Sequence, residues 1–162
     1  MRRRRWLLAG LPLLGLSACG FELRRGAALQ FQRIALAGFV PRSPMAEELR
    51  AVLSRSITVV PAPEQAQVVL QAVTEARSKK VVAYTASGQV RDTTLRLQFI
   101  YRAHTPGERE LIATSEINLY RDMSFIESQA LGKEQEERAL YREMQSDVVQ
   151  QVLLRLSSIR LE

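Results

Sequence analysis

Apolar and polar residues alternate most regularly between residues 93 and 104, and this pattern predicts a β-strand with one buried face. The apolar side chains that share this face occupy every second position: Leu95, Leu97, Phe99, Tyr101 and Ala103. A Thr-Pro-Gly triplet at 105–107 is a strong turn signal, and residues 111–120 have the composition of another strand. The two segments together predict an antiparallel hairpin.

Weaker patterns predict further strands on the N-terminal side of this hairpin. Residues 67–79 alternate loosely and residues 80–86 continue the pattern, before a Ser-Gly-Gln turn at 87–89. With the hairpin, these segments predict an antiparallel meander. Residues 31–40 and 57–60 predict a first strand and a short strand, and the short strand is followed by a Pro-Ala-Pro turn.

Two segments have the spacing of amphipathic helices. The first begins at Ser43, whose hydroxyl suits the N-cap, and continues with Pro44 at the first helical position and Glu47 at the positive end of the helix dipole. Its apolar face is formed by Met45, Leu49, Val52 and Leu53. The second covers residues 133–158, with apolar residues at four-residue steps: Leu140, Met144, Val148, Val152 and Leu156.

These elements predict one α+β domain over residues 31–162. A sheet with one apolar face and two helices with one apolar stripe each bury those surfaces when both helices pack on the same face of the sheet. The expected fold is therefore a two-layer sandwich, in which two helices cover one face of a mostly antiparallel sheet of four to five strands.

The first 18 residues have the pattern of a cleaved secretory signal. Four arginines at 2–5 precede an apolar run at 6–16. This run is about half of the roughly 20 residues that a membrane-spanning helix needs, so it indicates processing rather than a span. Residues 16–19 read Leu-Ser-Ala-Cys, which is the order of a lipobox: a branched aliphatic residue, two small residues and a cysteine at the cleavage point.

The lipobox predicts cleavage between Ala18 and Cys19, lipid on the Cys19 thiol, and a lipidated tether over residues 19–30. An ordinary small-residue cleavage site beside an incidental cysteine is the alternative. Because Cys19 is the single cysteine, no disulfide forms within the chain. Two or three acyl chains anchor a protein firmly, whereas one binds reversibly. Gly20 stands where an aspartate typically retains such proteins in the inner membrane, so we expect the outer membrane and its periplasmic side.

Charge changes the picture once the leader is removed. The whole chain has a formal charge of +6, but residues 1–18 hold four arginines and no acid, which leaves +2 for the mature chain. No clustered basic stripe remains, so the sequence does not favour nucleic-acid binding. The remaining chain of about 144 residues is long enough for a single core.

The sequence contains no recognisable catalytic constellation. His104, the single histidine, has no cysteine or carboxylate at ligand spacing and is expected at a solvated strand end. The acidic run Glu134, Glu136 and Glu137 is expected in the first turns of the second helix, where it complements the dipole. No glycine-rich phosphate loop, nucleophile motif or His-Glu metal pair is visible, so we expect no enzymatic activity, no cofactor and no metal.

Three patches, in the same order along the chain, resemble the LPS-assembly lipoprotein LptE family. Residues 19–24 read Cys-Gly-Phe-Glu-Leu-Arg, similar to the family's Cys-Gly-aromatic-His-Leu-Arg start. A Ser-Gly-Gln turn at 87–89 leads into the alternating strand, as in the family. The third patch begins at 130–136 and continues to residue 156. Glu22 departs from the usual histidine, and Ala86 replaces a residue that is basic in some relatives.

This resemblance implies a non-enzymatic subunit that plugs the outer-membrane β-barrel LptD in a one-to-one complex. It further implies help with barrel assembly and with the passage of lipopolysaccharide to the outer leaflet. Basic side chains expected to face outward are candidates for lipid A phosphates or acidic barrel walls. The candidate lipopolysaccharide-binding residues are Lys133, Lys80, Lys79 and Arg91, with Arg96 and Arg102 as further outward-facing cations.

Two alternatives stay open. The basic residues taken alone are more typical of ordinary solvated strand faces, and the family resemblance is what favours a binding role for Lys133 and its turn neighbours. A different function, a lipid- or small-ligand-binding auxiliary lipoprotein of an inner-membrane transporter, would use a groove between the helices and the sheet.

Overall fold

The computed structural model describes residues 29–124 and 130–161. Residues 1–28 lie outside this part, so the predicted leader, the cleavage at Ala18, the lipid on Cys19 and the departure at Glu22 are not placed. The elements follow one another as β1 Arg33–Ala37, α1 Pro44–Leu53, β2 Thr58–Val60, the 3-10 turn η1 Pro63–Gln65, β3 Val68–Tyr84, β4 Val90–His104, β5 Glu110–Ser124 and α2 Ala130–Leu156.

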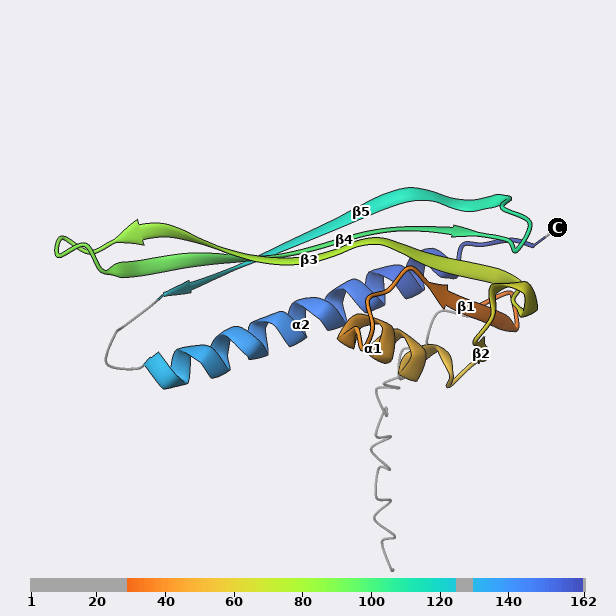
Figure 1. Ribbon diagram of the computed structural model, residues 1–162, viewed down its shortest axis with the longest axis horizontal. Helices are drawn as coiled ribbons and strands as arrows, with labels where there is room; N and C mark the ends of the chain where they lie inside the picture. Colours follow the sequence, from red (N-terminus) through yellow and green to blue (C-terminus); the bar gives the residue numbers. More distant parts are fainter. Residues whose placement is uncertain (1–28, 125–129, 162) are drawn as a thin grey trace, which may run out of the picture.

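The strands form one five-stranded sheet in the order β2-β1-β3-β4-β5 (Figure 1). β3, β4 and β5 pair antiparallel, which confirms the predicted meander. β1 instead runs parallel to both of its neighbours, β2 and β3, so the sheet is mixed. The reason is the helix α1, which carries the chain back between β1 and β2, because parallel neighbours need a crossover rather than a tight turn.

β3 is one continuous strand where the sequence pattern indicated two segments. Its register against β4 shifts at Val73 and again at Val82, so each of these valines is an extra residue in a β-bulge. The first bulge reverses the phase of the strand: Leu70 faces the core before it, and odd-numbered residues such as Glu75 face the helices after it. A change of phase within the strand explains why the alternation of residues 67–79 is loose.

Both helices cover the same face of the sheet, as predicted (Figure 1). Ser43 caps α1, because its hydroxyl accepts a hydrogen bond from the Ala46 amide at 3.1 Å. α2 begins at Ala130, earlier than the predicted start at Lys133. The acidic run therefore lies within the first turns of the helix, as expected, but in the second turn and not in the first. Its members pair with cations: Glu134 with Arg138, Glu136 with Lys133, and Glu137 with Lys79.

One apolar core lies between the sheet and the two helices. It is built from the odd-numbered positions of β4 and the apolar stripes of α1 and α2. Phe99 lies in the middle of this core, where its ring stacks on Phe39 on one side and Tyr101 on the other, with centroids 6.0 and 5.3 Å away. The predicted core face of the strand at 93–104 is confirmed.

A smaller apolar cluster lies on the opposite face of the sheet, next to η1. It consists of Ala35, Ala66 and Val69, and His104 pairs with Val69 in the β3–β4 register. The His104 residue is only 7% exposed and its Nδ1 lies 2.7 Å from the Thr105 carbonyl oxygen. The expected solvated position of His104 is therefore wrong, because its pairing with the buried Val69 at the start of β3 places it in a covered part of the sheet.

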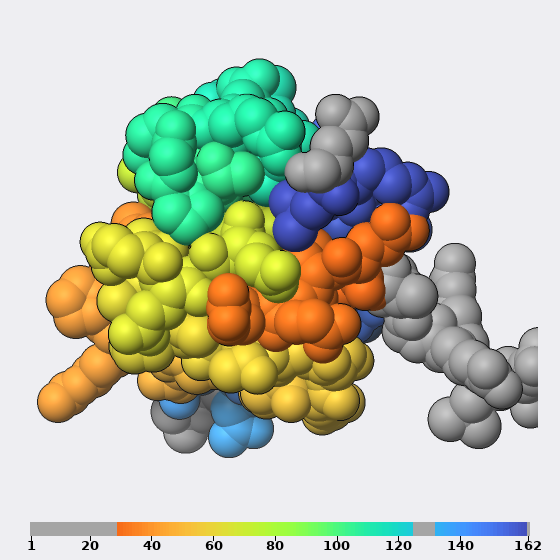
Figure 2. Space-filling view, turned by 90° about the vertical axis from the view of Figure 1, so that its right-hand side faces the viewer, coloured from red at the N-terminus to blue at the C-terminus, as the bar shows by residue number. Residues whose placement is uncertain are grey.

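The molecule is elongated and has two differently built regions (Figure 1). We call residues 29–72, 101–115 and 145–161 the proximal region; it contains β1, β2 and α1. Figure 2 looks onto this end of the molecule, where β1, the start of β3 and the β4–β5 turn lie close together. We call residues 73–100, 116–124 and 130–144 the distal region; its three strands run out to the β3–β4 hairpin. In the described ranges no helix is both long and apolar enough to cross a membrane.

Candidate functional site

Polar side chains cover the face of the distal sheet that the helices leave open. Arg96 on β4 donates two hydrogen bonds to the Asn118 side-chain oxygen on β5, at 3.0 and 2.7 Å. The Asn118 amide in turn donates to Glu116 at 2.6 Å, and Gln98 donates to the same Glu116 oxygen. Closer to the hairpin, Thr94 donates to Asp122 at 2.6 Å. We call these cross-strand contacts the polar ladder.

The polar ladder favours the charged form of Glu116. Hydrogen bonds from Gln98 and Asn118 lower the pKa of the Glu116 carboxyl below its ordinary value, and the positive charge of Arg96 acts in the same direction. The guanidinium of Arg96 also lies over the ring of Tyr120, 5.8 Å from its centroid, while Tyr120 itself is 53% exposed. The open face therefore presents fixed charges beside the exposed ring of Tyr120.

Two of the predicted lipopolysaccharide-binding residues form ion pairs with neighbouring glutamates in the N-terminal turns of α2. Lys79 on β3 forms an ion pair with Glu137 at 2.6 Å, and Lys133 pairs with Glu136 at the same distance. Lys79 does not face outward on the open side, as the sequence suggested. Its register partner is the buried Leu95, so Lys79 lies on the helix side of the sheet. The Lys133 side chain is only 13% exposed.

The other two candidates lie apart from this pair. Lys80 pairs in register with Thr94 and therefore belongs to the open face, opposite to Lys79. It has no hydrogen bond or ion pair with the described residues. Arg91 follows the hairpin turn and contacts only its neighbour Asp92, at 2.9 Å. The structure thus brings all four candidates to the distal region, but it divides them between two faces of the sheet and the hairpin.

Sequence reasoning missed a group of polar residues that ties β3 to the helices. The Tyr141 hydroxyl on α2 donates to the Ser78 backbone oxygen at 2.8 Å, on the part of β3 that has no strand neighbour on its outer side. Arg77 lies over the Tyr141 ring at 5.3 Å and donates to Gln145 at 2.8 Å. Burial, with the nearby Glu137 charge, raises the pKa of Tyr141, and Arg77 opposes this. The one available sequence signal was that Tyr141 interrupts the apolar stripe of the helix with a polar tip.

A groove of about 610 Å³ lies between α1 and α2. It is lined by charged side chains from both helices and β3, among them Glu48, Arg77, Glu137 and Arg142. Gln145 closes its floor by donating to Glu48 at 2.6 Å and to the Pro44 carbonyl oxygen at 3.2 Å. The groove therefore combines charged groups with apolar lining such as Pro44 and Ala51, and contacts between the two helices hold it in place.

The arrangement offers charged side chains that could bind a ligand of opposite charge. Within residues 29–124 and 130–161, no group of three or more His, Cys, Asp and Glu side chains is placed to hold a metal ion. Lysine and arginine side chains can donate charge-assisted hydrogen bonds to phosphate or carboxylate oxygens. At Lys79, Arg91 and Lys133 a ligand must displace an existing carboxylate partner, whereas Lys80 is free to bind directly.

Comparisons with known proteins agree in pointing to one family. The chain is 26% identical over 157 residues to the LPS-assembly lipoprotein LptE of Yersinia pestis (strain Pestoides F), covering 94% of this chain and 75% of that protein. The solution structure of uncharacterized lipoprotein B from Nitrosomonas europaea matches with a TM-score of 0.68 and 33% identity, over 83% of this chain and 88% of that one.

The rare lipoprotein B of Shewanella oneidensis shares the fold, with a TM-score of 0.67 at 20% identity over 78% of this chain and 95% of that one. The family model for LptE, described as lipopolysaccharide-assembly, matches residues 31–156, which include every strand and both helices of the sandwich. With this match the resemblance in the sequence is confirmed: the chain belongs to the LptE family of lipopolysaccharide-assembly lipoproteins.

Proposed function

We propose that this protein is a lipoprotein of the outer membrane that plugs the β-barrel LptD and helps it assemble and pass lipopolysaccharide to the outer leaflet. In this proposal residues 1–18 are cleaved, Cys19 carries the lipid, and the domain lies on the periplasmic side. Membership of the LptE family is the observation that carries the proposal. The relatives named for LPS assembly support the same role.

The shape and polarity of the sheet support the plug. Large membrane β-barrels have a polar interior, so a protein inside one needs a polar surface that is stable without being buried in apolar material. The polar ladder has this property, because Arg96 on β4 donates to Asn118 on β5, and Asn118 donates to Glu116 on the same strand. A pre-organised polar face of this kind contacts the barrel wall or its water without leaving unpaired charges.

Lipopolysaccharide binding is assigned to the distal region. Its lipid A part carries phosphates, for which Lys80, Lys79, Lys133 and Arg91 are donors of the right charge. Lys80 contacts the phosphate first because its ammonium has no partner in the described structure. Lys79 and Lys133 then leave Glu137 and Glu136 and bind phosphate oxygens instead. Both kinds of contact are charge-assisted hydrogen bonds, which are stronger than hydrogen bonds between neutral groups.

The partner is tested by affinity purification from outer membranes in mild detergent. We expect the tagged protein to bring down a large β-barrel in equal amount, identified by mass spectrometry. Recovery of the protein alone would contradict the plug. Intact-mass analysis of the same sample should show Cys19 as the acylated first residue, and in the Cys19→Ala variant we expect the lipid to be lost and the domain to remain folded.

Lipopolysaccharide binding is tested with the double variant Lys80→Gln/Lys133→Gln in a pulldown with purified lipopolysaccharide. We expect binding to fall about thirtyfold, since two contacts to a charged group are lost and each contributes roughly 1 kcal/mol. Arg142→Gln is the matched control, because Arg142 is also an unpaired cation on α2 in the described structure but is not among the candidates. Equal binding by the double variant and the control would refute the assignment.

We also propose that the protein has no enzymatic activity. The family is described by assembly of lipopolysaccharide and not by a reaction, which supports this. The alternative of an auxiliary lipoprotein of an inner-membrane transporter predicts fractionation with the inner membrane, so membrane separation by density distinguishes the two.

A further inference from the structure

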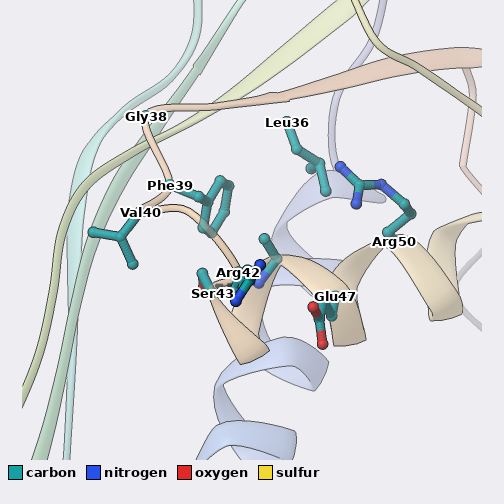
Figure 3. A pocket seen from close by; sticks show the side chains of 9 residues that line it. Leu36, Gly38, Phe39, Val40, Arg42, Ser43, Glu47 and Arg50 are labelled. Carbon is teal, nitrogen blue, oxygen red and sulfur yellow. Dashed lines mark hydrogen bonds between the residues drawn. The ribbon is translucent and has the colours of Figure 1, made fainter.

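A second concave site lies in the proximal region, at the start of α1 (Figure 3). We call it the α1 pocket. Its volume is about 400 Å³, and it is lined by the end of β1, the loop that follows and one side of α1. Cavities of roughly 300–1,000 Å³ accommodate small ligands. The side chains that matter for its chemistry are Leu36, Phe39, Val40, Arg42, Glu47 and Arg50.

The two arginines of the α1 pocket are exposed cations without partners. Neither the Arg42 nor the Arg50 guanidinium has a hydrogen bond or ion pair with the described residues, although Glu47 lines the same pocket. Arg42 has a backbone φ of 59°, in the left-handed region that favours glycine. An arginine at this position therefore carries a local backbone cost, which is typical of positions where the side chain is needed.

An apolar wall adjoins these charges. Figure 3 shows the Arg50 guanidinium turned toward Leu36, while Glu47 lies one helical turn before Arg50. Val40, in the loop before α1, is 59% exposed, and Phe39 beside it is anchored by stacking on Phe99. The pocket thus offers two donors for an anion, one acceptor for a cation and an exposed apolar rim.

The position of the α1 pocket along the chain places it near the predicted lipid anchor. Leu29, the first residue that the structure describes, lies ten positions after Cys19, and a fully extended chain of that length spans at most about 35 Å. β1 follows directly and leads into the loop that forms the pocket. The tether therefore limits how far the proximal region, which contains the α1 pocket, can lie from the leaflet that holds the lipid.

We propose that the α1 pocket docks on the anchoring membrane and takes the headgroup of a glycerophospholipid that carries both a phosphate and a protonated primary amine. Arg42 and Arg50 donate to the phosphate oxygens, and Glu47 accepts from the ammonium group. Val40 contacts the glycerol and upper acyl region. This proposal rests on the lipidation of Cys19 that the proposed function contains, but it does not need LptD.

The test is amide hydrogen exchange of the acylated mature protein in vesicles without any barrel partner. One vesicle contains phosphatidylethanolamine mixed with phosphatidylcholine, and the other contains phosphatidylcholine alone, whose quaternary ammonium has no N–H to donate. We expect the amides of residues 38–47 to exchange at least about threefold more slowly in the first vesicle, because docking suppresses local opening. Glu47→Gln should remove this difference between the two vesicles.

The double variant Arg42→Gln/Arg50→Gln should return exchange in the ethanolamine vesicle to the rate in the choline vesicle. Arg55→Gln is the matched control: Arg55 is exposed just after α1, has no described side-chain partner and does not line the pocket. Equal exchange in both vesicles, protection that survives the double variant, or protection that requires an added protein would each overturn the proposal. Loss of barrel co-purification alone would refute the plug and leave this result unchanged.

Discussion

The proximal and distal regions share three strands of one sheet, but they differ in how far their cationic side chains are paired. In the distal region most described cations already contact an acceptor, as Lys79 does with Glu137 and Arg121 with Asp147. In the proximal region a set of arginines has no side-chain partner among the described residues: Arg33, Arg42, Arg50, Arg55, Arg109 and Arg160.

The difference follows from what each region has available for packing. The proximal region places β1, β2 and α1 around a deep apolar core, and several of its arginines stay at the surface without a side-chain partner among the described residues. The distal region has three strands and one helix, and its outer half of β3 has no strand neighbour. Cross-strand and strand–helix polar contacts such as the polar ladder stabilise it instead. Paired cations in this protein support the structure, whereas cations without a partner among the described residues are free to bind a ligand.

Removal of a core side chain in the proximal region should have the largest effect. Leu49 on α1 is fully buried in the core, so Leu49→Ala is expected to lower the free energy of unfolding by about 2–5 kcal/mol in urea denaturation. Leu119, which is only partly buried in the distal region, provides the control, and Leu119→Ala should cost less than half as much. An equal loss of unfolding free energy in both variants would contradict the view that the proximal region depends more on its apolar core than the distal region does.

The cap of α1 should come next. Ser43→Ala removes the hydroxyl that accepts from the Ala46 amide and donates to Glu75 on β3 at 2.6 Å, so we expect a loss of about 1–2 kcal/mol. Ser54→Ala, at the exposed C-terminal end of the same helix, should change stability by less than about 0.5 kcal/mol. Thermal unfolding followed by circular dichroism measures both. A Ser43→Ala protein as stable as the control would argue against this link between α1 and β3.

A smaller effect is expected where α2 holds the free edge of β3. Tyr141→Phe removes the hydrogen bond to the Ser78 carbonyl oxygen but keeps the ring under Arg77, so the cost should be about 1 kcal/mol. Hydrogen exchange should increase in the distal half of β3 and not at β1. Tyr120→Phe, at an exposed tyrosine on the open face, serves as the control and should leave both measurements unchanged.

The smallest effect concerns Glu116 and pH. Its folded pKa lies below the ordinary value of 4.5, so its contribution to stability is present above that value and is lost as pH falls through the lowered pKa. Glu116→Gln keeps the shape and cannot be protonated in this range. We therefore expect the variant to show a shallower loss of stability in acid, measured by urea unfolding at successive pH values. Parallel curves for the two proteins would indicate that the polar ladder has no such effect.

Much of the fold was predictable from neighbours in sequence. The strict alternation at 93–104 predicted the core strand, and Ser43 with Pro44 predicted the start of α1, because periodicity and capping depend on residues within a few positions. The looser alternation of β3 did not allow its faces to be predicted, since the bulge at Val73 changes the face that each later residue occupies. His104 was also misplaced, because its burial depends on pairing with Val69 on β3, far away in the chain, and not on its sequence neighbours.

The candidate site was only partly predictable. The sequence by itself determined that basic residues occupy β3, the hairpin and the N-terminal turns of α2, that a lipobox precedes the domain, and that the mature chain has little net charge. Only the tertiary structure decided that Lys79 and Lys80 face opposite sides, that Lys79 meets Glu137, and that Arg42 and Arg50 share a pocket. The physical reason is that a contact such as Lys79–Glu137 joins residues 58 positions apart, and its geometry is set by strand register and helix placement, not by local pattern.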